Sequence, residues 1–546
     1  MNNTRLHAML RRSSPLLVPA LIPVLVTLLY GGFLNNPLVF DDQYFFLPGN
    51  PEKYVAQGFQ FHPRWLPYYS HGLTFTLIGD QVIWQRIGNL ILHASTGLAL
   101  YGLIRQLVAD LQSPRDGAFG SRWAALFAAL LFVLHPAAVY AAGYLIQRTI
   151  VMATLFSLLC WLSFWRGLNG SRTGLWASVL FYLLAVFSKE HAIMVPAICG
   201  ALLILHQRSG LPLTPKRPEL IGTIAAQCAI ALFVYMRFKG FVGNAYEPLA
   251  SSMFDTLDAS IPKGLAYPLS VLTQVGLFFK YLLLWIVPNG TWMSIDMREP
   301  FLLPPITLQD WAFAAAFFAY PCITCLMLWR GRTSGLLGLA LLAPWLLFAT
   351  EISSVRLQEI FVLYRSYLWM APLFILVAVA GLKLSKQLAI GLGLVFCSAV
   401  FLMSIDRLTS FAEPVLLWGD AADLVEQRSN QKNLSGIERI FHNRGLALYA
   451  HGMKKNAIDD FTTAISIQPG FAHAYSDRGA AHLDRGEFMQ ALQDFDKAIA
   501  LDEGLTRAYA GRAQTLEKLH DPAAGQAHAL ACRKGFARSC SWNEPQ

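Results

Sequence analysis

Two adjacent carboxylates, Asp41 and Asp42, follow the first long apolar run of the chain, within Phe40-Asp41-Asp42-Gln43-Tyr44. A carboxylate at a membrane surface could accept the proton of an attacking hydroxyl group as a general base. Its neighbour could hold a divalent metal ion or orient a group near a phosphate. An isolated Asp-Asp pair is more often the solvated start of a loop, so this chemistry needs support from other residues.

Basic side chains provide that support, because several are expected at the same membrane boundary as Asp41. These are Arg64, Arg86, Arg148, Lys189, Arg237 and Arg365. Guanidinium groups bind phosphate in a bidentate manner, which suits a lipid phosphate or pyrophosphate. Each arginine taken singly is better explained by contact with lipid headgroups or by snorkelling. Their gathering around a carboxylate pair favours group transfer from a lipid-phosphate carrier.

Other polar and aromatic residues near this boundary have two readings each. His62, His71, His93 and His135 lack the spacing of a metal site, so structural hydrogen bonding is expected for them. Trp65, Tyr68 and Tyr69 could stack on a sugar, although an aromatic belt at the membrane interface explains them more simply.

Composition indicates which elements must position these residues. Hydrophobic residues make up 55% of the 546-residue chain and charged residues only 14%, whereas soluble proteins carry roughly 25% charged residues. The charge deficit lies in residues 14–404, and residues 406–546 are polar. We therefore expect a membrane domain followed by a water-exposed domain. The formal charge of +9 does not indicate nucleic-acid binding, because the basic residues lie between apolar runs as topology signals.

About eleven apolar runs have the length of a membrane span. They lie near 15–35, 82–104, 123–143, 149–166, 174–188, 190–207, 219–236, 310–329, 334–350, 366–382 and 387–404. Residues 267–288 contain Gln274 and Lys280, which predicts an interfacial or re-entrant helix. The bias of Lys and Arg between loops places the N-terminus inside and the C-terminal domain outside. If 267–288 crosses instead, the C-terminal domain moves inside.

The C-terminal region repeats with a period of about 34 residues. Asn443-Arg444-Gly445 returns as Asp477-Arg478-Gly479 and as Gly511-Arg512-Ala513. This pattern resembles tetratricopeptide repeats, whose helical solenoids bind peptides or partner proteins, although these units could also simply brace the membrane domain. We predict a membrane domain at 1–405 with its first outer loop at 36–81, a linker at 406–438 and repeats at 439–540. In an oxidising compartment Cys532 and Cys540 could form a disulfide.

Further short segments join Phe40-Asp41-Asp42 along the expected outer face. They are Pro63-Arg64-Trp65-Leu66, Gln85 to His93, Leu134-His135-Pro136, Gln147-Arg148, Ser188-Lys189-Glu190, Thr273-Gln274, Ser353-Ser354 and Tyr364-Arg365-Ser366-Tyr367-Leu368. With them the chain resembles the GT-C superfamily of integral-membrane glycosyltransferases, in particular the protein O-mannosyltransferase-like type with tetratricopeptide repeats, in its bacterial branch. The chain departs from that pattern at Tyr140, at Glu351-Ile352 and at Leu363-Tyr364, which bears on the acceptor and the sugar.

The resemblance implies an all-α fold, a polytopic helix bundle followed by the solenoid, and an inverting glycosyltransferase. A sugar would pass from a polyprenyl-phosphate carrier to a protein hydroxyl group, on a pilin or another secreted protein, at the periplasmic side of a bacterial inner membrane. It also implies roles for residues. Asp41 would be the general base and Asp42 its support or a metal ligand; Arg64, Arg148, Lys189 and Arg365 would bind the carrier phosphate; Glu190, His93, Gln274 and Tyr367 would contact substrate.

Three alternatives stay open. The acceptor could be a glycolipid or polysaccharide, although the repeats favour a polypeptide. The chain could be a non-catalytic scaffold that recruits partners through its repeats, in which case Asp41 would be dispensable. A transporter would place charged residues near the bilayer midplane, whereas here they gather at one boundary.

Overall fold

The structure is a computed structural model that describes residues 3–47, 49–60, 64–111, 120–244, 263–428, 434 and 436–541. The chain divides into two compact units. The first, called the membrane unit, comprises residues 1–293 and 301–412, and the second, called the repeat unit, comprises residues 294–300 and 413–546. The predicted boundary at 405 therefore falls inside a helix that continues to Ala412, and the predicted linker 406–438 contains a further helix, α19 (Pro414–Glu426).

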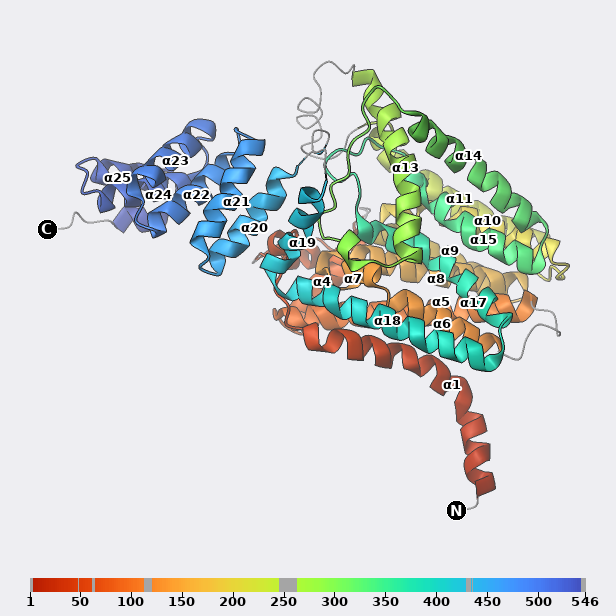
Figure 1. The fold of residues 1–546 in the computed structure, drawn as a ribbon. Coiled ribbons are helices and arrows are strands. Elements are labelled where there is room, and N and C mark those ends of the chain that lie inside the picture. Colours follow the sequence, from red (N-terminus) through yellow and green to blue (C-terminus); the bar gives the residue numbers. More distant parts are fainter. Residues whose placement is uncertain are drawn as a thin grey trace. The chain divides into compact units, whose positions relative to one another are not determined.

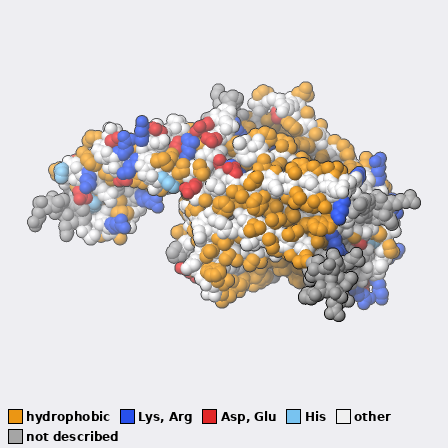
Figure 2. Space-filling view, turned by 60° about the horizontal axis from the view of Figure 1, so that its bottom comes forward, with side chains coloured by type: hydrophobic (Ala, Val, Ile, Leu, Met, Phe, Trp, Pro, Cys, Tyr) orange, Lys and Arg blue, Asp and Glu red, His pale blue; other side chains and the backbone are white. Residues whose placement is uncertain are grey.

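Within its described residues, the regular secondary structure of the membrane unit is helical (Figure 1). Its main helices are α1 (Asn3–Tyr30), α3 (Asn50–Ala56), α4 (Trp65–Leu77), α5 (Val82–Leu111), α6 (Ser121–Val133), α7 (Pro136–Ala142), α8 (Arg148–Leu168), α9 (Arg172–Ser188), α10 (Val195–Arg208), α11 (Arg217–Phe238), α13 (Ala266–Ile286), α14 (Leu308–Trp329), α15 (Arg332–Leu347), α16 (Ser366–Met370), α17 (Ile375–Leu382) and α18 (Lys386–Ala412). In Figure 2 hydrophobic side chains cover the visible face of this unit, and Lys and Arg gather at one edge of that face.

The length and apolar composition of these helices identify the chain as a multi-pass membrane protein. Within the described residues nine helical stretches are long and apolar enough to cross a membrane, or ten when the bent pair α6–α7 counts as one span. The apolar parts of α1 and α9, Leu17–Phe33 and Arg172–Ser188, are shorter. The sequence predicts spans in both of these places, and it does not predict one in α13, which is among the nine.

Contacts between loops define two ends of the membrane unit. At one end, called the basic end, the backbone N–H of Arg332 donates to Ser209 Oγ over 2.7 Å, which joins the start of α15 to the end of α10. At the other, called the polar end, Arg86 donates to the carbonyl groups of Asn36 and Gly143, each over 2.9 Å. Asn36 also donates to the Leu408 carbonyl over 3.2 Å, so the end of α18 belongs to the polar end.

Helix α13 runs across the direction of α5 and α18 (Figure 1). Near the start of α13, Ser270 Oγ accepts from the Arg356 N–H over 2.9 Å, and after α13 Arg407 donates to the Met293 carbonyl over 3.1 Å. Arg356 lies 3.7 Å from Glu351, beside the site described below, and Arg407 is next to Leu408 in sequence, so both flanks of α13 lie at the polar end. The length and composition of α13 would allow it to span a membrane, so its interfacial or re-entrant placement stays a prediction.

A break between α6 and α7 shapes the polar end. Pro136 begins α7 and has no N–H to continue the hydrogen bonds of α6, while the side chain of His135 caps α7 by accepting from the Ala137 N–H over 3.2 Å. The two helices meet at a bend of 65°. The bend directs the chain toward the turn Tyr144–Gln147, which contributes to the site.

The repeat unit consists of α19 followed by α20 (Glu438–Ala450), α21 (Lys454–Ile467), α22 (Ala472–Asp484), α23 (Phe488–Leu501), α24 (Thr506–Lys518) and α25 (Ala524–Arg533). The same contacts recur at the predicted period. Arg444 pairs with both carboxylate oxygens of Asp460 and Arg478 with those of Asp494, all at 2.8 Å. Cys532, near the end of α25, forms a disulfide with Cys540, which lies beyond that helix.

Candidate active site

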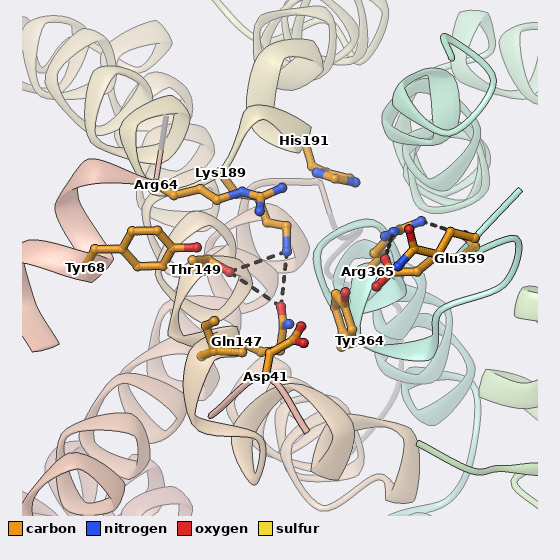
Figure 3. Close-up of a pocket in the computed structure, with 12 residues that line it drawn as sticks. Asp41, Arg64, Tyr68, Gln147, Thr149, Lys189, His191, Glu359, Tyr364 and Arg365 are labelled. Atoms are coloured by element: carbon orange, nitrogen blue, oxygen red, sulfur yellow. Dashed lines mark hydrogen bonds and ion pairs between the residues drawn. The ribbon is translucent and has the colours of Figure 1, made fainter. Parts of the chain in front are cut away.

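A cavity of about 180 Å³ opens at the polar end of the membrane unit (Figure 3). Its lining residues are Asp41, Arg64, Tyr68, Ile146, Gln147, Thr149, Lys189, His191, Gln358, Glu359, Tyr364 and Arg365. Asp41, Arg64, Lys189 and Arg365 are thus brought together from four distant stretches of sequence. The predicted carboxylate and three of the four predicted phosphate-binding cations share one cavity, which we call the pocket.

A tight turn directs Asp41 into the pocket. Phe40 adopts a left-handed backbone conformation with φ of 50°, which is uncommon for a residue with a side chain. The Asp41 N–H donates to the Tyr144 hydroxyl over 3.1 Å. In Figure 3 the Asp41 carboxylate points toward the same space as the Lys189 ammonium group.

Asp42 faces the protein interior and does not line the pocket. Its carboxylate accepts from the N–H groups of Leu145 and Ile146, over 3.3 and 2.8 Å, and is fully buried. Burial raises the pKa of Asp42 to about 7, although the two amide hydrogen bonds and Arg86 oppose that rise. Asp42 therefore fastens the loop that carries Asp41 to the turn that carries Gln147, and this fixes the position of both pocket residues.

Lys189 is the cation that the geometry makes most available to an anion. It is 3% exposed, and its ammonium group donates to Gln147 Oε1 over 3.1 Å and to Thr149 Oγ1 over 3.4 Å, both of which are neutral. Burial first, and then the nearby cations Arg64 and Arg365, lower the pKa of Lys189 to about 7, against partial opposition from carboxylates. An anion in the pocket would meet a positive charge that no ion pair in this network already neutralises.

Arg64 enters the pocket paired with the carboxylate of Glu190. The guanidinium group donates to the two oxygens of Glu190 over 2.6 and 3.2 Å, and both side chains are partly exposed. The Arg64 backbone is left-handed, with φ of 66°, at the start of α4. Glu190 itself does not line the pocket. Its carboxylate orients Arg64, and its contact with substrate stays a prediction.

Arg365 is held by a buried charge network. It donates to Glu359 and, over 3.1 Å, to Glu351, which is fully buried. Glu351 also accepts from His191 over 2.8 Å and lies 3.7 Å from Arg356. Burial alone would raise the pKa of Glu351, but Arg356, Arg365 and the His191 hydrogen bond outweigh it and hold that pKa well below its usual range. The network fixes the direction of Arg365 before any ligand binds.

The structure places the other predicted site residues outside the pocket. Arg148 is buried beneath it, where it donates to Asn89 Oδ1 over 2.7 Å, to the Gln85 carbonyl over 2.8 Å and to Ser70 Oγ over 3.2 Å. These bonds join α4, α5 and α8. Arg148 stands at the start of α8, and there its side chain points into the helix bundle and away from the predicted carrier phosphate.

Three predicted substrate contacts are also buried elsewhere. His93 and Tyr367 hydrogen-bond to each other over 2.7 Å inside the bundle, and Gln274 donates to the Ile360 carbonyl over 2.6 Å. Neither group lines the pocket. The hydrogen bond between His93 and Tyr367 joins α5 to α16. The hydrogen bond from Gln274 holds α13 to the 351–362 segment.

Sequence reasoning missed several lining residues, most of them next to residues that it identified. Gln147 precedes Arg148, His191 follows Glu190, and Tyr364 precedes Arg365. The ring of Tyr364 lies 4.9 Å from the ammonium group of Lys189. In the sequence, these residues could be found only as neighbours of the predicted ones. Which neighbour faces the cavity depends on the local backbone rotation, which the sequence does not show.

The pocket suits an anion better than a metal ion. Its lining carboxylates are Asp41 and Glu359, and Glu359 pairs with Arg365. Within the described residues no cluster of three or more His, Cys, Asp or Glu side chains could hold a metal. The second carboxylate of the predicted metal pair, Asp42, is turned toward backbone amides. We therefore derive no step through a metal ion.

Comparison with known proteins adds a weak structural likeness. No protein family and no curated protein matches the sequence. The archaeal oligosaccharyltransferase AglB from Archaeoglobus fulgidus, solved in complex with an inhibitory peptide and a dolichol-phosphate, aligns with a TM-score of 0.41 and 14% sequence identity over 74% of this chain. The aligned region spans 56% of that protein.

Proposed function

We propose that the membrane unit is a GT-C-type glycosyltransferase that moves a sugar from a polyprenyl-phosphate carrier to a protein hydroxyl group. The observation that carries this proposal is the shared cavity: the Asp41 carboxylate and the Lys189, Arg64 and Arg365 cations face one space at the polar end. A base for the acceptor and cations for the leaving phosphate are what this transfer requires.

The reaction would be a single displacement. Asp41 takes the proton of the acceptor hydroxyl group as its oxygen attacks the anomeric carbon. The bond between that carbon and the carrier phosphate oxygen breaks, and the phosphate leaves with the electron pair. Lys189 would stabilise the leaving phosphate most strongly, since its hydrogen-bond partners are neutral, while Arg64 and Arg365 are already paired with carboxylates. One displacement inverts the configuration of the anomeric carbon.

We assign the polar end to the outer, periplasmic side of a bacterial inner membrane. Arg166, Arg172, Arg208, Arg330 and Arg332 flank the helix ends that form the basic end, as the positive-inside rule requires of an inner face. With α13 interfacial, the repeat unit follows α18 on the outer side. Its tetratricopeptide-like helices would then recruit the polypeptide acceptor, with a pilin or another secreted protein as a candidate.

Glycan masses on outer-compartment proteins test this proposal. Cells would express the parent, Asp41→Asn or Asp80→Asn, and intact-protein mass spectrometry would follow the acceptor with membrane levels matched. Asp80 is an exposed aspartate of the same loop outside the pocket, which makes it a matched control. We expect the added mass with the parent and Asp80→Asn and its loss with Asp41→Asn. Equal profiles in all three strains would reject protein glycosylation through Asp41 and favour a glycolipid acceptor or a scaffold.

A further inference from the structure

A second cavity adjoins the pocket at Tyr68. Its volume is about 330 Å³, and its lining residues are Asn50, Lys53, Tyr54, Gln57, Gln60, Trp65 and Tyr68. They come from α3, from α4 and from the turn that follows α3. Tyr68 lines both cavities, and in Figure 3 its hydroxyl end points into the pocket. A ligand in this second cavity would therefore lie next to the groups proposed to carry out transfer.

Aromatic rings form one part of the second cavity and are held in place from behind. The rings of Tyr54 and Tyr68 pack on Phe45, with centroids 5.4 and 4.9 Å away, and lie 5.0 Å from each other. Trp65 stacks on Tyr69 with centroids 5.1 Å apart, and its indole N–H donates to the Gly58 carbonyl over 2.6 Å. These contacts fix the orientation of the rings without a ligand, and an ordered ring needs little further ordering when it binds.

Amide side chains form the rest of the lining. Asn50 is engaged, since it donates to the Tyr44 carbonyl over 2.9 Å and accepts from Lys53 over 3.3 Å. The amides of Gln57 and Gln60, in contrast, hydrogen-bond to no group among the residues that the structure describes. Each amide offers one acceptor and two donors. The described lining residues include no carboxylate, which disfavours a cation or a metal ion as the ligand.

We infer that this cavity is a carbohydrate-binding subsite. A pyranose ring presents apolar C–H faces that pack on aromatic rings and hydroxyl groups that both donate and accept hydrogen bonds. Ordered rings beside amides that hydrogen-bond to none of the described residues match both properties. Lys53, in a described lining without carboxylates, selects a neutral or acidic sugar over an amino sugar with a free ammonium group. The role of the subsite rests on the proposed function: it would hold a sugar of the donor, or a sugar already present on the acceptor.

Binding of free sugars tests the subsite without requiring transfer. The full chain in detergent would be mixed with glucose, mannose, galactose, N-acetylglucosamine or glucuronic acid and studied by saturation-transfer-difference NMR. We expect transfer of saturation to at least one sugar, and binding about tenfold weaker in Gln57→Ala/Gln60→Ala, because two hydrogen bonds are lost. The matched control is Gln81→Ala, an exposed glutamine of the same loop outside both cavities, which should bind as the parent does. Absence of binding to every sugar, or equal binding in the double variant, would overturn the inference.

Transfer measurements separate the two sources of the sugar. If the subsite holds a donor sugar, Gln57→Ala/Gln60→Ala should raise the KM for the donor on every acceptor. If it holds a sugar on the acceptor, only transfer to an acceptor that already carries a sugar should weaken. Failure of this inference is distinguishable from failure of the proposed function. Loss of transfer in Asp41→Asn without sugar binding would reject the subsite alone, whereas sugar binding with the same acceptor profile in Asp41→Asn as in the parent would reject transfer through Asp41 alone.

Discussion

Replacement of Lys189 by Met should abolish a pH dependence of anion binding in the pocket. The pKa of Lys189 in the empty pocket is about 7, so the protonated fraction falls from about 90% at pH 6 to about 10% at pH 8. A bound phosphodiester stabilises the charged form and raises this pKa. Affinity should therefore fall about tenfold from pH 6 to pH 8, which corresponds to about 1.4 kcal/mol.

The assay would use farnesyl methyl phosphate, a lipid phosphodiester with one negative charge throughout this pH range. Calorimetric titration of the full chain in detergent would give Kd at pH 6, 7 and 8, independently of catalysis. Lys189→Met should bind about tenfold more weakly than the parent at pH 6 and show a flat profile, because the titrating cation is gone. Lys239→Met removes an exposed lysine outside the pocket and should retain the profile of the parent. A flat profile in the parent, or an equal slope in Lys189→Met, would refute the reasoning.

Three further substitutions separate structural roles from binding roles. Arg148→Met should lower the stability of the folded protein by about 3 kcal/mol, since it leaves buried acceptors unpaired; thermal unfolding in detergent measures this, and loss of phosphodiester binding at unchanged stability would contradict it. Asp42→Asn should remove a pH dependence of stability: the folded-state pKa is raised to about 7, so this carboxyl group stabilises the fold when protonated and loses that contribution as pH rises from about 4 through 7. Melting temperatures at pH 5 and 8 should differ less in Asp42→Asn than in the parent, and an equal difference would count against the assignment. Arg444→Ala should destabilise the repeat unit by about 2 kcal/mol because Asp460 stays buried without its partner, whereas Arg507→Ala, at an exposed position, should be neutral in the same melting experiment.

Sequence reasoning could predict which residues meet at the polar end. Apolar runs of span length make alternate loops share one side of a membrane, so Asp41, Lys189 and Arg365 were expected together although far apart in sequence. The expected interfacial placement of 267–288 rests on the same kind of pattern. Gln274, Tyr281 and Trp285 share the buried face of α13, where each hydrogen-bonds to the 360–366 segment.

Sequence could not predict which member of each adjacent pair faces the pocket. Asp41 lines it while Asp42 binds backbone amides, and Gln147 lines it while Arg148 joins three helices. Neighbouring side chains on a turn or helix point in different directions, so the local rotation of the backbone decides between them. The left-handed conformation of Phe40 is one such local feature, and nothing in the identity of a phenylalanine predicts it.

The central claim is that Asp41 acts as the base in a sugar transfer within this pocket. The most direct test measures the rate at which sugar mass appears on the acceptor in isolated membranes that contain their own lipid-linked donors. The rate is expressed per mole of enzyme and compared among the parent, Asp41→Asn and Asp80→Asn. The account predicts a rate lower by about 10²- to 10⁴-fold for Asp41→Asn, with Asp80→Asn equal to the parent. Equal rates for all three proteins would contradict it.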